Sequence, residues 1–207
     1  DCLLSRGLGD VYKRQTLLQA GTIQVGSNAA LGAGALTASA GTTLANGTAV
    51  PLALANSAVL QDDLTVQSGA AGLALNGDVS GAGGLVKTGT GNLTLAGNNT
   101  YQGNTQLTAG QLTVGSNTAL GTGNLIASAG TALTASTPVQ LQNGVTLNGG
   151  LTVTGANDLT LAGAIGGAGG LTQAGTGTLT LAAANSFSGG VQLNSGTLAV
   201  GNNAALG

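Results

Sequence analysis

Residues 81–121 read GAGGLVKTGTGNLTLAGNNTYQGNTQLTAGQLTVGSNTALG, and residues 167–207 read GAGGLTQAGTGTLTLAAANSFSGGVQLNSGTLAVGNNAALG. The second stretch lies 86 residues after the first, and 24 of the 41 aligned positions are identical. Self-similarity at a fixed spacing is the signature of a repeat protein, in which each unit has the same shape and rests on its neighbour. Both copies keep mainly glycines and alternating leucines.

A third, shorter copy lies near the start of the chain. Residues 20–32 (AGTIQVGSNAALG) align with residues 109–121 at an offset of 89, and the alignment continues back to Thr16. The chain therefore divides into a partial repeat, a complete repeat and a second partial repeat, which span residues 16–80, 81–166 and 167–207.

Residues 1–15 (DCLLSRGLGDVYKRQ) differ in composition from everything that follows. They contain three of the four basic residues, the only cysteine and one of the two tyrosines. The order of basic start, apolar core and small-residue cleavage site that marks a secretory signal is missing. We expect this segment to be foreign or artefactual and outside the fold.

The remaining 192 residues carry very little charge. They contain one lysine and no His, Glu, Met, Trp or Cys, and their acidic residues are Asp62, Asp63, Asp78 and Asp158. Nucleic acids and anionic membranes are bound by basic patches, which one lysine cannot form. Apolar runs stay far below the roughly 20 residues of a spanning helix. We expect no nucleic-acid partner and no membrane-spanning segment.

The local pattern is that of short strands joined by tight turns. Segments such as residues 111–114 (QLTV) and 151–154 (LTVT) alternate apolar and polar residues, which is typical of strands buried on one face. Between such segments stand Asn-Gly and Gly-Gly pairs, which favour tight turns. An all-β fold without long helices is predicted.

Near-identical units favour a solenoid over a sandwich, because stacked coils give each unit the same surroundings. An 86-residue unit divides into about four coils of roughly 21 residues. The prediction is a parallel β-helix, a β-solenoid, of about nine coils. At about 4.8 Å per coil this is a rod about 40 Å long.

The only aromatic residues after residue 15 are Tyr101 and Phe187, and they occupy the same position in the two copies. A narrow β-helix interior has room for few rings. We expect both to fill a corner or cap a core row; the alternative is that they stack on a ligand.

Residues 83–103 (GGLVKTGTGNLTLAGNNTYQG) and 110–115 (GQLTVG) resemble the autotransporter-associated β-strand repeat of Gram-negative autotransporter passenger domains. Residues 169–201 form the second copy. The resemblance implies a right-handed parallel β-helix that is exported through the periplasm and outer membrane and displayed at the cell surface, often within an adhesin. It also implies a translocating outer-membrane barrel as partner in a longer full-length chain, of which we expect these residues to be a fragment.

Two features fit such a passenger. A chain without cysteine cannot be trapped by disulfides in the oxidising periplasm. Uncharged Asn side chains can also form hydrogen-bonded ladders along a stack, where like charges would repel. Candidates for ladders, with ordinary turn propensity as the alternative, are Asn98, Asn99, Asn117, Asn185 and Asn203.

The inventory of reactive residues predicts no enzyme. Nucleophilic triads and most zinc sites need His or Cys, and neither occurs after residue 15. The adjacent Asp62 and Asp63 would point to opposite faces of a strand, so a solvated turn is expected rather than a calcium or catalytic site. Lys87 is replaced by Gln173 in the second copy, which we interpret as a solvated position. No catalytic, cofactor or metal site is predicted.

Two functions remain. The first is a structural stalk or scaffold within a cell-surface passenger. The second is a binding surface, in which rows of Thr and Asn recognise a carbohydrate receptor or an identical rod, with ice as a distant option. Thr176, Thr178 and Thr180 suggest such a row, although their counterparts are Thr90, Asn92 and Thr94.

Overall fold

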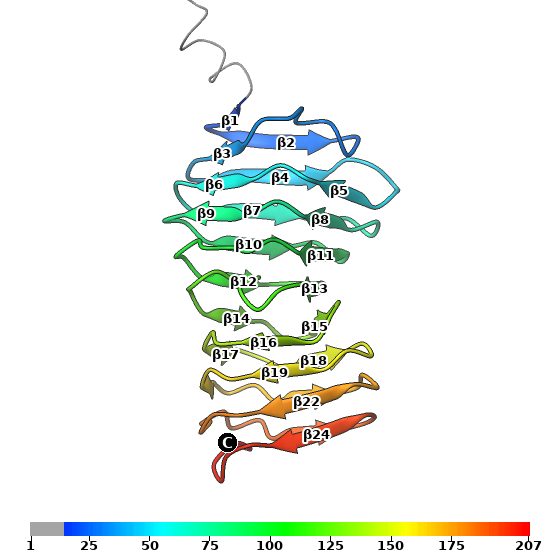
Figure 1. The fold of residues 1–207 in the computed structure, drawn as a ribbon, viewed down its shortest axis with the longest axis vertical. Coiled ribbons are helices and arrows are strands. Elements are labelled where there is room, and N and C mark those ends of the chain that lie inside the picture. The colour runs from blue at the N-terminus through cyan, green and yellow to red at the C-terminus, as the bar shows by residue number, and fades with distance from the viewer. Residues whose placement is uncertain (1–14) are drawn as a thin grey trace, which may run out of the picture.

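The computed structural model describes residues 15–207 as a stack of coils, each contributing short strands to the faces of one solenoid (Figure 1). Its 24 strands pair only in parallel, and no helix occurs in this part of the chain. The prediction of an all-β solenoid of about nine coils is confirmed. The expectation that residues 1–15 are foreign concerns residues that, apart from Gln15, lie outside the described range.

The strands form three faces. Face 1 consists of two four-stranded sheets, β1 (Thr16–Leu18), β3 (Leu36–Ala38), β6 (Ala58–Leu60), β9 (Val79–Gly81), and then β16 (Val139–Leu141), β19 (Leu159–Leu161), β22 (Thr178–Leu181), β24 (Thr197–Val200). Face 2 consists of β2 (Gly21–Val25), β4 (Thr42–Asn46), β7 (Leu64–Gln67), β10 (Leu85–Thr88), β12 (Thr105–Leu107), β14 (Leu125–Ala127), β17 (Val145–Leu147), β20 (Ile165–Gly166). Face 3 consists of β5 (Leu52–Leu54), β8 (Leu73–Leu75), β11 (Asn92–Leu95), β13 (Gln111–Val114), β15 (Thr131–Ala135), β18 (Leu151–Thr154), β21 (Leu171–Gln173), β23 (Val191–Leu193).

The two sheets of face 1 are joined by coils that follow the same path without forming strands. Hydrogen bonds between successive coils make this link, among them Thr100 N to Val79 O (2.8 Å), Thr122 N to Tyr101 O (2.9 Å) and Gln140 N to Asn117 Oδ1 (2.8 Å). Face 1 is therefore continuous along the whole stack.

The core is a set of apolar columns that run along the axis. Because side chains alternate along a strand, every second residue points inward and meets its register partner in the next coil. On face 3 one such column contains Leu52, Leu73, Leu93, Leu112, Leu133 and Val153, all buried. Burying each of these side chains stabilises the fold by about 1.5–3 kcal/mol, so the alternating leucines kept by the repeats hold the coils together.

A glycine that both copies keep at the same position, Gly81 and Gly167, allows coils to approach closely. Gly81 and Gly167 have φ of 111° and 109°, a region that residues with a Cβ rarely adopt. A Cβ at Gly81 would also overlap the carbonyl oxygen of Leu60, and one at Gly167 would overlap that of Leu147. Only glycine fits these two positions without strain.

The sequence repeat is not a whole number of coils. Four coils lead from Leu85 on face 2 to Ile165 on the same face, in steps of 20 residues. The counterpart of Leu85 is Leu171, which lies on the next strand, β21, on face 3. An 86-residue repeat thus spans four coils and one further face, and equivalent side chains of the two copies point in different directions.

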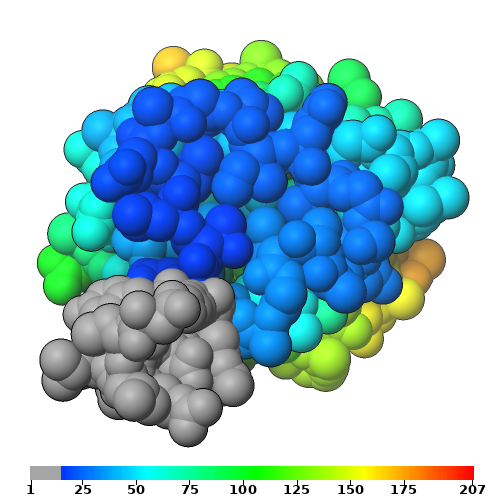
Figure 2. All heavy atoms as spheres, turned by 90° about the horizontal axis from the view of Figure 1, so that it is seen from above, coloured from blue at the N-terminus to red at the C-terminus, as the bar shows by residue number. Residues whose placement is uncertain are grey.

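The first and last coils bound the stack. Seen from the N-terminal end, the first coils, in blue, cover much of the described chain behind them (Figure 2). In the last coil, Leu193, Val200 and Leu206 are about half exposed. The coil-on-coil packing that buries apolar side chains elsewhere is incomplete there.

Candidate functional site

The acidic residues serve as backbone acceptors. Asp62 and Asp63 lie in an exposed turn, as expected. Oδ1 of Asp63 accepts a hydrogen bond from Gly84 N of the following coil (2.7 Å), and Oδ1 of Asp62 accepts one from Asp63 N (2.8 Å). Asp78 and Asp158 bond to the next coil in the same way as Asp63. Among residues 15–207 there is no cluster of three or more His, Cys, Asp or Glu that could hold a metal ion.

Lys87 is buried, so the prediction of a solvated position is wrong. Its relative exposure is 0%, and it lies in an inward column of face 2 between Val66 and Leu107. The sequence contained the signal, since Lys87 follows Leu85 at the spacing of two that marks the same side of a strand. Replacement by a neutral amide in the second copy does not require a solvated position, because both side chains point inward.

Three backbone carbonyls surround the Lys87 amine. Nζ donates hydrogen bonds to Thr88 O (2.9 Å), Gly89 O (2.7 Å) and Ala109 O (3.1 Å). Burial lowers the pKa of Lys87 to about 8, because removal from water disfavours the charged form. The amine therefore closes the corner between β10 and β11 from the inside.

Gln173, the counterpart of Lys87, is also buried and also bonds to a corner. Its Nε2 donates to Gly175 O (3.2 Å) and Gly177 O (2.9 Å) at the turn between β21 and β22. Its Oε1 has no hydrogen-bond partner within the described chain. What the two copies keep at this position is an N–H donor that faces inward, not a charge.

The two aromatic residues are in the interior, as expected of plugs. Tyr101 and Phe187 are 0% and 2% exposed, which leaves neither ring free to stack on a ligand. The Tyr101 hydroxyl lies 2.5 Å from Thr105 Oγ1. Burial raises the pKa of Tyr101 well above its usual value.

Asn99 and Asn185 connect three coils each. Oδ1 of Asn99 accepts from Val79 N (2.8 Å) in the preceding coil, and its Nδ2 donates to Ala119 O (2.6 Å) in the following one. Asn185 makes the equivalent pair of bonds at 2.8 and 2.7 Å. These side chains bridge to backbone rather than to other asparagines, so the prediction of asparagine ladders is correct only in that the bonds run along the axis.

The other three candidates take smaller parts. Oδ1 of Asn117 accepts from Gln140 N of the following coil. Asn98 receives a long bond of 3.5 Å from the Thr118 hydroxyl, and Asn203 lies in an exposed turn.

The outer surface of face 3 carries a row of polar side chains. Thr94, Thr113, Thr134 and Thr154 follow one another in register along four coils. Their hydroxyls are linked to each other and to neighbouring amides by five bonds: Thr134 Oγ1 with Thr154 Oγ1 (2.5 Å), Gln111 Nε2 to Thr134 (2.5 Å) and to Thr154 (3.2 Å), Thr113 to Asn92 Oδ1 (2.9 Å), and Asn92 Nδ2 to Thr94 (3.0 Å).

The row suggested by the sequence has a different arrangement. Thr178 and Thr180 lie on β22 of face 1, whereas their counterparts Asn92 and Thr94 lie on β11 of face 3. The two copies therefore cannot form one array. The row on face 3 arises from coil stacking, which sequence comparison at the 86-residue spacing does not show.

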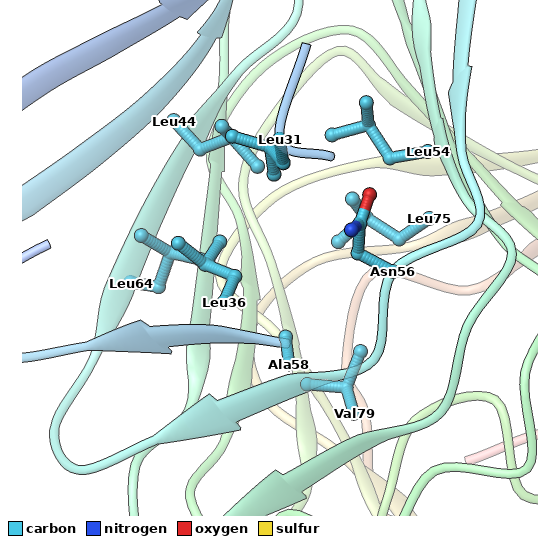
Figure 3. Close-up of a pocket in the computed structure, with 9 residues that line it drawn as sticks. All are labelled: Leu31, Leu36, Leu44, Leu54, Asn56, Ala58, Leu64, Leu75 and Val79. Atoms are coloured by element: carbon cyan, nitrogen blue, oxygen red, sulfur yellow. The ribbon is translucent and has the colours of Figure 1, made fainter. Parts of the chain in front are cut away.

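One enclosed hollow lies inside the stack. Leucines from all three faces converge on it, among them Leu36, Leu44 and Leu54 (Figure 3). Its volume of about 10 Å³ is at the lower limit for holding a single water molecule, so it is a packing gap. The Asn56 amide at its edge is occupied by hydrogen bonds to Gly32 O and Gly34 O.

The outer hollows are open and uncharged or nearly so. One of them, about 330 Å³, lies at the corner between faces 2 and 3 and is lined by Gln24, Asn46, Gln67 and Thr90 among others. The second, about 240 Å³, includes Gln140 and a single carboxylate. Such surfaces offer amides and hydroxyls to a ligand.

A comparison with protein families matches the two segments that contain the corners closed by Lys87 and Gln173. Residues 85–114 and 171–200 match the family described as passenger-associated-transport-repeat. The chain carries two autotransporter passenger repeats. Each matched segment begins two residues before the inward donor, Lys87 or Gln173, and includes the buried aromatic ring. Comparison with curated proteins and with solved structures gave no match.

The two matched repeats imply an autotransporter passenger segment, and their family suggests secretion or display on the surface of a Gram-negative bacterium. Within residues 15–207, no helix has both the length and the apolar character needed to cross a membrane.

Proposed function

We propose that residues 16–207 are a structural stalk within the passenger, a rigid spacer that presents other parts of the protein away from the cell and has no enzymatic activity of its own. The observation that carries this proposal is the rotation of the repeat. Because each passenger repeat spans four coils and one face, equivalent outer side chains point in different directions. The copies share interior features instead.

Rigidity along the axis follows from bonds between successive coils. Besides the parallel ladders, carboxylate and carboxamide side chains at the corners bond to backbone one coil away, as Asp63, Asp158 and Asn99 do. Each such bond contributes about 0.5–1.5 kcal/mol, and they repeat along the stack. A rod held in this way keeps the parts of the passenger at its two ends at a fixed distance, and this role needs no unique binding site.

The composition and the coil-by-coil contacts of residues 16–207 are also compatible with export. The absence of cysteine after residue 15 keeps the chain free of disulfides in the periplasm. Contacts in a solenoid are almost all between neighbouring coils, so folding outside the cell can proceed coil by coil. The partner for export is a translocating outer-membrane barrel in the full-length protein.

A second candidate function rests on the Thr row of face 3. The row presents aligned hydroxyls and amides over four coils without charge. Such a surface suits a carbohydrate or the same face of an identical rod, and an adhesin role would use it directly.

Replacement within the full-length passenger tests the stalk. Residues 16–207 are exchanged for an unrelated β-helix with the same number of coils, and the passenger is displayed on cells. A stalk predicts that adhesion by the rest of the passenger is retained after exchange and reduced after simple deletion. Loss of adhesion after both changes would overturn the stalk and favour the second function.

Beads coated with residues 16–207 test the second function. The variant T113K/T134K places two charges in adjacent coils of the face 3 row, and T43K/T65K does the same on face 2. Clumping that is lost only in the face 3 variant would support the binding surface. Beads that stay dispersed in every case would support the passive stalk.

A further inference from the structure

The turns Gly89-Thr90-Gly91 and Gly175-Thr176-Gly177 place several carbonyl groups toward the interior. A buried carbonyl without a hydrogen bond costs free energy comparable to a lost bond, so these corners need donors from side chains. The two corners belong to equivalent positions of the two passenger repeats and join different pairs of faces.

At the first corner, Lys87 supplies most of the donors. Its amine reaches carbonyls within its own coil and, through Ala109 O, the following coil. Ser68 of the preceding coil adds a bond from Oγ to Gly91 O (3.1 Å). Ala109 has no donor in its side chain and needs none.

At the second corner, two neutral side chains share the task. Gln173 bonds to Gly175 O and Gly177 O as described above. Oγ of Ser195, in the following coil, lies 2.6 Å from Ala174 O and 2.9 Å from Gly175 O, and its single O–H is shared between these two carbonyls. These are the counterparts of Thr88 O and Gly89 O, which Lys87 serves in the first copy.

Two substitutions therefore accompany each other. Lys87 and Ala109 in one copy correspond to Gln173 and Ser195 in the other, at the same offset of 86. A glutamine amide has two N–H donors and an oxygen that cannot bond to a carbonyl, whereas an ammonium has three donors. The single O–H of Ser195 supplies the third donor that the two-donor glutamine lacks.

A second buried pair follows the same pattern. The Tyr101 hydroxyl bonds to Thr105, and the counterparts of these residues are Phe187 and Val191. Both polar partners are replaced by apolar residues together. The first copy therefore has both hydroxyls and the second has neither, and no hydroxyl is left without its partner.

We propose that positions 87 and 109, and likewise 173 and 195, form a coupled pair, the corner lock, in which either one lysine or a glutamine with a serine closes the turn. The corner lock concerns the stability of the coils, so it does not depend on the proposal that the chain is a stalk. Passenger corners are exchangeable between copies only when both members of the pair change together.

A double-mutant cycle on residues 16–207 tests the lock by equilibrium unfolding. K87Q is expected to raise the unfolding equilibrium constant at least tenfold, because it removes the ammonium bonds to Thr88 O and Ala109 O; Thr88 O keeps only its backbone bond from Ser68 N (3.2 Å), and Ala109 O loses its donor. A109S alone should change it less than threefold, and K87Q/A109S should recover most of the loss. A70S, which adds a hydroxyl in an exposed turn, is the control and should act alike in both backgrounds.

The same effect of A109S in the wild-type and K87Q backgrounds would overturn the proposal. The mirror experiment covers the case that K87Q does not fold. S195A should speed amide hydrogen exchange at the second corner about tenfold in the wild type and little in Q173K, whose lysine can reach the same carbonyls. Equal acceleration in both backgrounds would also count against coupling.

Discussion

Replacing Gly81 by alanine tests how closely the coils approach each other. Gly81 has φ of 111°, and a Cβ there would overlap Leu60 O in the neighbouring coil. The backbone conformation costs about 1–3 kcal/mol for a residue with a Cβ. Relief of the overlap, which requires backbone to shift, adds about 1–3 kcal/mol. We expect G81A to lose about 2–6 kcal/mol of stability.

Two other glycines separate these contributions. Gly130 also has positive φ, 74°, but a Cβ there would meet nothing within 4 Å, so G130A should lose only the conformational part. Gly150 has neither constraint, and G150A should change stability by less than about 1 kcal/mol, with a gain from the restricted unfolded chain.

Urea unfolding of residues 16–207 followed by far-UV circular dichroism measures all three. The order of loss should be G81A, then G130A, then G150A, and G167A should match G81A although it lies on another face. In thermal unfolding, each kcal/mol lowers Tm by about 2–4 °C for a chain of this size. If G81A were as mild as G130A, the close approach of coils at this position would be refuted.

Three further outcomes are expected. Stability should rise as pH increases from about 8 to about 10.5, because in this window the unfolded chain keeps the Lys87 proton and the folded chain releases it; in K87M, urea titrations at several pH values should show this rise abolished. N99A should lose about 2–3 kcal/mol in urea unfolding, since it leaves two buried backbone groups unpaired, whereas N98A at an exposed position should lose less than about 0.5 kcal/mol. Y101F should lose about 1 kcal/mol by leaving the buried Thr105 hydroxyl alone, and Y101F/T105V should regain most of it; additive losses in that pair would contradict the reasoning.

The fold was largely predictable because the strands and coils of a solenoid appear in the sequence as alternating apolar residues and as repeats at a fixed spacing. Alternating apolar residues in segments such as residues 111–114 predicted strands with one buried side, and β13 has that pattern of burial. The interior positions of Tyr101 and Phe187 followed from the scarcity of rings in a narrow core. Neither inference needed knowledge of which strands pair.

Lys87 shows where comparison of the two copies misled. Its replacement by a neutral glutamine suggested a solvated side chain, but an inward-facing N–H donor allows the same replacement, since burial of a charge is costly only without partners. Its carbonyl partners include Ala109 of the following coil, and no local pattern reveals that such carbonyls converge. The alternation of β10 was the better guide.

By itself, the sequence determined that this protein is a repetitive all-β solenoid with glycine turns and inward leucines, since these depend on spacing along the chain. Only the tertiary structure decided which residues meet across coils. The offset between an 86-residue repeat and coils of 19–22 residues turns each copy by one face. Because contacts between coils depend on the register of stacking, the corner lock and the Thr row of face 3 exist only once the coils are stacked.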